Sequence, residues 1–131
     1  MLRKAVWGML VALLLGCEER ERLVFENNPS DRVGPTSSID PPSKDTTLTE
    51  GDLFVIGART ADTSGVDSVF IEVSGANLSY LPIDANGVDT LNFAISFPTL
   101  GLSGRTVTVG VFGVDVIGNV GPTVSRRLTI D

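Results

Sequence analysis

The sequence predicts an all-β sandwich, and three observations lead to this fold class. First, apolar residues recur at every second position, as they do on one face of a β-strand; the clearest example is Val107, Val109 and Val111 in the stretch Arg105–Gly121. Second, turn-forming residues separate such segments at a spacing of roughly ten residues, which is typical of sandwiches. Third, no stretch of the sequence shows a helical period.

Turn-forming residues bound each expected strand. Ala61–Gly65 predicts a turn, Asn86-Gly87 predicts a hairpin, and Pro82 suits an edge strand. The central strand is expected at Val107–Val111, because it is dense in β-branched residues. The other expected strands are Leu53–Thr60, Val69–Val73, a weak strand around Ser79–Ile83, Leu91–Phe97 and Thr123–Ile130.

The N-terminal part of the chain has the composition of a signal peptide. A basic start with Arg3 and Lys4 precedes an apolar run from Ala5 to Leu15. As a helix this run is only about 17 Å long, which is too short for a hydrocarbon core of about 30 Å. We therefore expect residues 1–16 to be a cleaved leader and not a membrane span.

The next segment has the composition of a flexible tether. From Glu18 to about Asp45 the sequence is charged and rich in Pro and Ser, and its one apolar triplet, Leu23–Phe25, is too small to form a core. We expect residues 17–45 to form a tether with a typical reach of about 30 Å. The folded domain is then expected over residues 46–131.

Composition excludes several classes of function. The formal net charge is −6, and the chain has no basic patch that could displace counterions from phosphates, so nucleic acid is not an expected partner. Cys17 is the only cysteine, so no disulfide can form within the chain, and histidine is absent. The sequence thus lacks the usual general base and nucleophiles, and we expect no enzymatic activity.

The end of the leader resembles the lipobox of bacterial lipoproteins. Leu14-Leu15-Gly16-Cys17 has a leucine at the first position and a small residue before the cysteine. The resemblance implies that Cys17 is acylated, becomes the mature N-terminus and anchors the protein to a lipid bilayer of the cell envelope. Glu18 follows the cysteine, which by the same resemblance favours the outer membrane if the source is Gram-negative. The alternative is a plain secretory leader with an incidental cysteine.

Two turns resemble those of bacterial Ig-like (fibronectin-III-like) domains. The segment Ala61–Val69, ADTSGVDSV, resembles the turn between the second and third strands, and Asp115–Asn119, DVIGN, resembles the turn between the last two. The resemblance implies an Ig-like β-sandwich of about seven antiparallel strands. These motifs are structural, so they imply a fold and no activity.

Acidic and amide side chains in the loops form a candidate Ca²⁺ site. Oxygen ligands at loop tips are what Ca²⁺ uses, although Asp and Asn are also common in turns because they cap nearby amides. The sequence contains no EF-hand spacing. The candidate ligands are Asp62, Asp67, Asp115 and Asn119.

An aromatic pair forms the other candidate site. Phe70 and Phe112 lie on the outward parity of strands that should be neighbours, so their rings could meet, and Arg127 from the last strand could flank them. An exposed aromatic pair can mark a surface that binds a partner. The alternative is that the tether or a loop covers one ring, or that the ring is a single exposed apolar residue.

These observations favour a lipid-anchored, non-catalytic Ig-like module. Its expected role is to bind another envelope protein or a polysaccharide, or to act as a structural spacer. The alternative function is a calcium-dependent adhesion module, with Ca²⁺ as the only cofactor considered. An enzyme such as a hydrolase ranks last, because the candidate carboxylates lie in turns without a basic partner.

Overall fold

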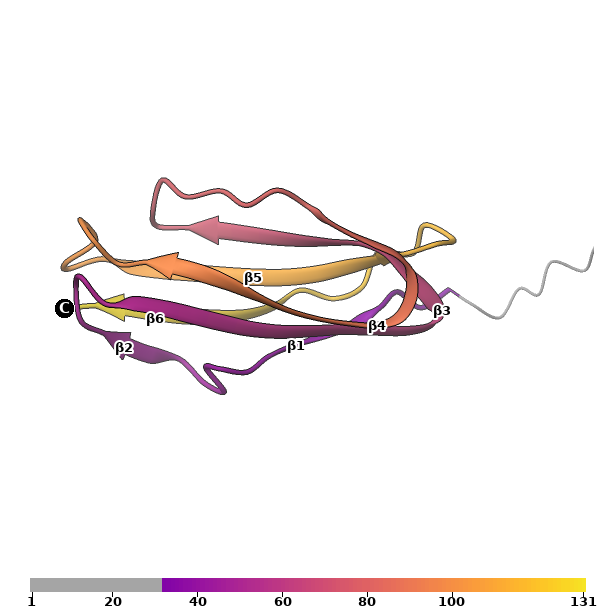
Figure 1. Cartoon of the computed structure of the whole chain (residues 1–131), viewed down its shortest axis with the longest axis horizontal. Coiled ribbons are helices and arrows are strands. Elements are labelled where there is room, and N and C mark those ends of the chain that lie inside the picture. The colour runs from indigo at the N-terminus through magenta and orange to yellow at the C-terminus, as the bar shows by residue number, and fades with distance from the viewer. Residues whose placement is uncertain (1–31) are drawn as a thin grey trace, which may run out of the picture. The chain divides into compact units, whose positions relative to one another are not determined.

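The fold is all-β. The computed structural model describes residues 32–131, so the predicted signal peptide, Cys17 and the first part of the predicted tether lie outside its range. Within residues 32–131 the chain forms six strands, where about seven were expected (Figure 1). This part of the chain contains no helix, as predicted, and hence no helix that could cross a membrane. The strands are β1 (Thr36–Ile39), β2 (Thr46–Leu48), β3 (Leu53–Ser74), β4 (Ile83–Pro98), β5 (Thr106–Asp115) and β6 (Val124–Ile130).

Two long strands build both layers of the sandwich. Residues 53–61 of β3 pair with β1 and with residues 90–98 of β4, and these segments form the first layer. Residues 66–74 of β3 pair with residues 83–88 of β4 and with β5, and β6 and β2 continue this second layer. All pairs are antiparallel except β2 with β6, which is parallel and departs from the fully antiparallel expectation.

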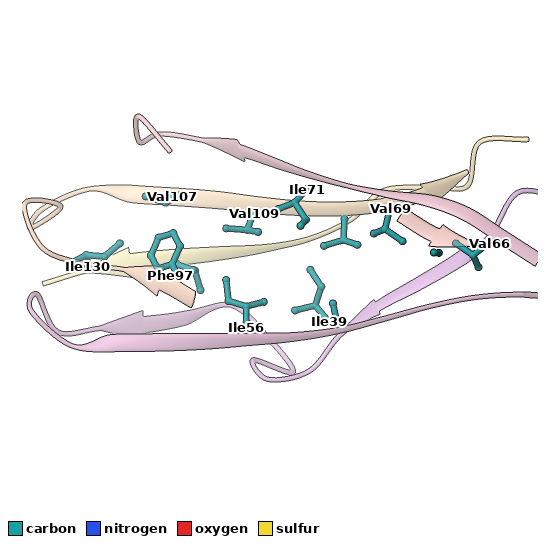
Figure 2. Packing of buried hydrophobic residues seen from close by; sticks show 13 residues of the cluster. Ile39, Ile56, Val66, Val69, Ile71, Phe97, Val107, Val109 and Ile130 are labelled. Carbon is teal, nitrogen blue, oxygen red and sulfur yellow. The ribbon is translucent and has the colours of Figure 1, made fainter. Parts of the chain in front are cut away.

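The core lies between the two layers. Figure 2 shows Val107 and Val109 of β5 on one side of it and Ile56 of β3 and Ile39 of β1 on the other. Val107, Val109 and Val111 are each fully buried, which confirms the central strand expected from their alternation. The other fully or nearly fully buried apolar residues are Ile39, Ile56, Ala58, Val66, Val69, Ile71, Ala85, Phe97, Leu128 and Ile130.

Two predicted turns are bends inside continuous strands. Ala61–Gly65 lies within β3, where the register shifts between Ala61 and Val66. Asn86-Gly87 lies within β4 and not in a hairpin loop, so that prediction is wrong. Both Asn86 and Gly87 have positive φ, and a Cβ at Gly65 would lie 2.6 Å from the Gly87 carbonyl oxygen. Positive φ values can close a hairpin, but here they allow β4 to bend beside the bend of β3 where both strands pass from one layer to the other.

The weak strand expected around Ser79–Ile83 does not form. The chain is irregular until Ile83, where β4 begins. Leu78 and Tyr80 pack against the core instead, and the Tyr80 hydroxyl donates a hydrogen bond of 2.8 Å to the carbonyl oxygen of Ser96 in β4. Pro82 lacks an N–H for a ladder, which accounts for the delayed start of the strand.

The sandwich begins before Thr46. β1 lies inside the segment that was predicted to be a tether, and Ile39 and Pro42 are buried. The predicted boundary between tether and domain is therefore corrected: the buried Pro35 and the residues of β1 already take part in the fold. The composition of this segment concealed β1, because a four-residue edge strand needs only one buried side chain, that of Ile39.

Candidate functional site on the outer face of the second layer

The side chains of β3, β5 and β6 that point away from the core form three rows across the second layer. The first row pairs Phe70 with Phe112, and Gly110 occupies the middle of the second row. In the second row Glu72 and Ser125 flank Gly110, and in the third row Ser74 and Arg127 flank Thr108.

The predicted aromatic pair is formed. The rings of Phe70 and Phe112 stack with their centroids 5.0 Å apart and their planes at 10°. Both residues are half-buried, so the pair remains accessible on the outer face. A stacked pair of this kind stabilises its two strands by about 0.5–1.5 kcal/mol beyond the area it buries. The parity argument from the sequence predicted the face of both rings, and the register between β3 and β5 places them opposite each other.

Beyond the ring pair the surface is hollowed. A groove with a volume of about 430 Å³ follows the second and third rows. Gly110 has no side chain, and it lies between longer residues on both neighbouring strands. The residues that line the groove are Glu72, Val73, Ser74, Thr108, Gly110, Thr123 and Ser125.

Arg127 does not flank the rings. It pairs with Thr108, which is four residues from Phe112 along β5, or about 13 Å at 3.3 Å per residue. Its backbone N–H donates a hydrogen bond of 2.8 Å to the Asp45 carboxylate. The expectation is thus corrected: Arg127 lies in the row farthest from the rings.

Its neighbour Arg126 is a structural residue that the sequence reasoning missed. The register pairs Arg126 with the buried Val109, so its side chain starts from the inward parity of β6. The guanidinium donates hydrogen bonds of 3.0 Å to the carbonyl oxygens of Pro42 and Ile39. The sequence did contain a sign of this role, because Arg126 has the same parity as the apolar residues Val124 and Leu128 and so should face the core side.

Asp115 is a turn-capping residue. Its carboxylate is 1% exposed and accepts hydrogen bonds from the Ile117 and Asn119 backbone N–H groups and from the Asn119 side-chain amide, at 2.8–3.0 Å. Burial raises the pKa of this carboxyl, but the hydrogen bonds from Asn119 and the turn amides outweigh it and hold the pKa below its ordinary value. These contacts satisfy both carboxylate oxygens of Asp115 within its own turn.

The remaining candidate Ca²⁺ ligands are also engaged locally. Asp62 accepts a hydrogen bond from the Ser64 N–H through Oδ1, while its buried Oδ2 has no hydrogen-bond partner, and Asp67 accepts one from the Ser68 hydroxyl. Residues 32–131 contain no group of three or more acidic, histidine or cysteine side chains that could hold a metal ion. The structure therefore does not bring Asp62, Asp67 and Asp115 together as a ligand set.

No protein-family model matches this chain, and no curated protein matches it. Solved structures do match. The crystal structure of a mutant SrpA adhesin from Streptococcus sanguinis has a TM-score of 0.54 at 17% identity, over 78% of this chain and 57% of the adhesin chain. Fibronectin(III)-like modules of Clostridium thermocellum CbhA have a TM-score of 0.51 at 10% identity, over 73% of this chain and 96% of theirs.

A third solved structure is a sialic acid binding region of a Streptococcus sanguinis SK1 adhesin bound to 3'sLn. It has a TM-score of 0.53 at 20% identity, over 77% of this chain and 30% of the adhesin chain. This chain thus spans little more than half of one adhesin chain and under a third of the other. At these identities the likeness establishes the fold, which is an Ig-like, fibronectin-III-like β-sandwich.

Proposed function

We propose that this protein is a lipid-anchored, non-catalytic binding module of a bacterial cell envelope. Acylated Cys17 would hold it to the bilayer, and the outer face of the second layer would bind an envelope polysaccharide or protein. The observation that carries the binding role is the stacked, half-buried Phe70–Phe112 pair beside an open groove. Solved adhesins share the fold, which supports a binding role without assigning a ligand.

The anchor is supported by the sequence. The apolar run that ends in Gly16-Cys17, followed directly by charged residues, resembles the pattern at which bacterial lipoproteins are processed, although Leu15 is less usual than Ala or Ser at its position. Several acyl chains on one cysteine bury enough CH₂ groups for stable attachment, whereas a single chain gives only reversible binding. Glu18 after the cysteine favours the outer membrane in a Gram-negative source.

Substitution of Cys17 tests the anchor. In the Cys17→Ser variant no thiol remains for acylation, so the protein should move from the membrane fraction to the soluble fraction and lose incorporation of labelled palmitate. Fractionation with immunoblotting measures this. The Phe70→Ser variant serves as the control and should stay in the membrane. If Cys17→Ser is retained in the membrane as fully as the wild type, the protein is not anchored through this cysteine.

Substitution of the ring pair tests the binding face. Phe70→Ser removes one ring of the stack, so capture of an envelope component by the solubilised protein should fall by about tenfold, the fold-change that corresponds to about 1.4 kcal/mol. The matched control is Leu53→Ser, which removes an exposed apolar side chain (71% exposed) from β3 in the first layer. Equal recovery of envelope components by the wild type and Phe70→Ser, at matched melting temperatures, would show that this face does not bind them.

A further inference from the structure

The groove over Gly110 exists because one position of the central strand has no side chain. Gly110 is the middle residue of a row with Glu72 on one side and Ser125 on the other. Its φ does not lie in the left-handed region, so the backbone does not require glycine here. Glycine inside a strand weakens it, and such a glycine often marks a place where a ligand or another backbone approaches closely.

Comparison with Gly113 in the same strand shows that Gly110 needs a separate explanation. A Cβ at Gly113 would lie 2.6 Å from the Thr60 Cγ2 and 3.0 Å from the Pro35 Cβ, so packing against the core side accounts for that glycine. A Cβ at Gly110 would meet only the Thr123 Cγ2 at this range, at 3.0 Å, and would project into the groove. The Thr123 methyl therefore covers part of Gly110, which is itself buried, and the rest of the space beside it is open as the groove.

The polar groups around the groove are unused. Within residues 32–131 the hydroxyls of Ser74, Thr108, Thr123 and Ser125 and the carboxylate of Glu72 make no hydrogen bond to another protein group. Each hydroxyl can both donate and accept, and the carboxylate accepts through two oxygens. The groove thus presents several hydroxyl groups and one acceptor-only group beside the position of Gly110.

This donor and acceptor set fits a neutral saccharide. Sugar hydroxyls donate and accept in the same way as the serine and threonine hydroxyls, and they can donate to Glu72. The only ionisable side chain lining the groove is that carboxylate, which disfavours an anionic ligand, and one carboxylate is too few for a Ca²⁺ site. The volume of about 430 Å³ falls in the range of about 300–1,000 Å³ for small-ligand sites.

The ring pair completes the site. Phe70 and Phe112 lie one outward row from Glu72 and Gly110, which is about 7 Å along the strands. They would give an apolar contact for the C–H groups of a sugar ring that extends from the groove. We propose that the hollow over Gly110 binds an uncharged pyranose unit of an envelope polysaccharide; this inference rests on the binding role proposed above for the same face.

Binding of simple saccharides tests the inference. The full chain, solubilised in detergent and immobilised, is titrated with the neutral disaccharides maltose, cellobiose, lactose and chitobiose, and with 3'-sialyllactose as an acidic probe, by surface plasmon resonance. We expect at least one neutral disaccharide to bind at millimolar concentration and the acidic probe to bind more weakly than lactose. Absence of binding by every neutral probe, or preference for the acidic one, would overturn the inference.

Three variants connect the binding to the groove. Gly110→Val fills the hollow and should abolish saccharide binding. Thr108→Val keeps the shape but removes one hydroxyl, and should weaken binding by about threefold to tenfold, as the loss of one hydrogen bond predicts. Asn92→Ala, at an exposed position of β4 in the first layer, is the control and should bind as the wild type does. Melting temperatures separate loss of binding from loss of fold, and Thr108→Val remains informative if Gly110→Val is unstable.

The outcomes distinguish this inference from the binding role itself. If Phe70→Ser prevents capture of an envelope component while Gly110→Val and Thr108→Val leave capture and saccharide binding unchanged, the face binds a partner but the groove is not a saccharide site. If none of these three variants changes the capture of any envelope component, both the inference and the proposed binding role are wrong.

Discussion

At the scale of single residues, Asp115 shows how one carboxylate organises a turn. Three donors converge on it, and two of them are backbone N–H groups of the exposed turn that follows β5. Hydrogen bonds to a charged acceptor are stronger than neutral ones, which is why the pKa of this buried carboxyl is lowered and not raised.

We predict that Asp115 makes the protein sensitive to acid. Its folded-state pKa is below the ordinary aspartate value of about 3.9, so its contribution to stability is complete above that value and is lost as the pH falls through the folded-state pKa. Asp115→Asn should lower the free energy of unfolding at neutral pH by about 1–3 kcal/mol and flatten the acid limb of the stability curve. Urea titrations between neutral pH and about pH 2 measure both effects.

The control for this prediction is Asp89→Asn, at an exposed position of β4, which should change neither quantity appreciably. An acid limb in Asp115→Asn as steep as that of the wild type would show that other carboxyl groups cause the acid sensitivity.

At the scale of elements, the connection between β1 and β2 joins the two layers. β1 pairs with β3 in the first layer and β2 pairs with β6 in the second, so residues 40–45 cross from one to the other. Arg126 holds this crossing through the carbonyl oxygens of Ile39 and Pro42, and Asp45 accepts from the Arg127 N–H. One inward-parity arginine thus replaces an apolar contact at the edge of the core.

We predict that Arg126→Met destabilises the domain by about 1.5–3 kcal/mol, because the carbonyl groups of Ile39, Pro42 and Ser125 lose a charged donor. Methionine keeps much of the aliphatic stem, so the loss reports mainly on the hydrogen bonds. The change in the urea midpoint measures it, and Arg59→Met, at an exposed position of β3, is the matched control. Identical midpoints for the two variants would mean that the guanidinium contacts contribute nothing net.

At the scale of the whole molecule, the two layers share covalent strands. β3 and β4 each run through both layers, so neither layer can lose its pairing without disturbing the other (Figure 1). Most pairings also join residues far apart in the sequence, such as β1 with β3 and β2 with β6. Such a topology favours a single cooperative transition.

We predict that the described domain unfolds in one step. Tyr80, the only tyrosine, contacts the core beside β4, so its fluorescence reports on a different place from the far-UV circular dichroism of the strands. The two signals should give the same urea midpoint. Midpoints that differ beyond experimental error would reveal an intermediate in which one region has already opened.

The sequence predicted those features that depend on strict alternation. Val107, Val109 and Val111 identified the central strand, and the opposite parity placed Phe70 and Phe112 on the same outer face, where their rings stack. Alternation gives the face of each residue, but it does not give the register between strands, which is why the position of Arg127 relative to the rings was wrong.

Three other features could not be predicted from the alternation of apolar residues, and each has a physical reason. Asn86 and Gly87 have the positive φ values of a hairpin turn, and the sequence cannot distinguish a chain that reverses from a strand that bends. Within β1 only Ile39 is buried, so its polar composition resembles that of a tether. The groove was missed because a glycine contributes to it by the absence of a side chain, which becomes visible only when its neighbours on both strands are known.

The hydrogen bond from Tyr80 to Ser96 has a consequence for the behaviour of many copies together. Residues 90–98 of β4 pair only with β3 in the part of the chain that the structure describes, so they form an outer edge of the first layer. An uncovered edge is a template on which a second molecule can add a strand and begin a fibril. The phenol of Tyr80 already donates to one main-chain acceptor of that edge, the Ser96 carbonyl, so this group is engaged before a second molecule could pair with the strand.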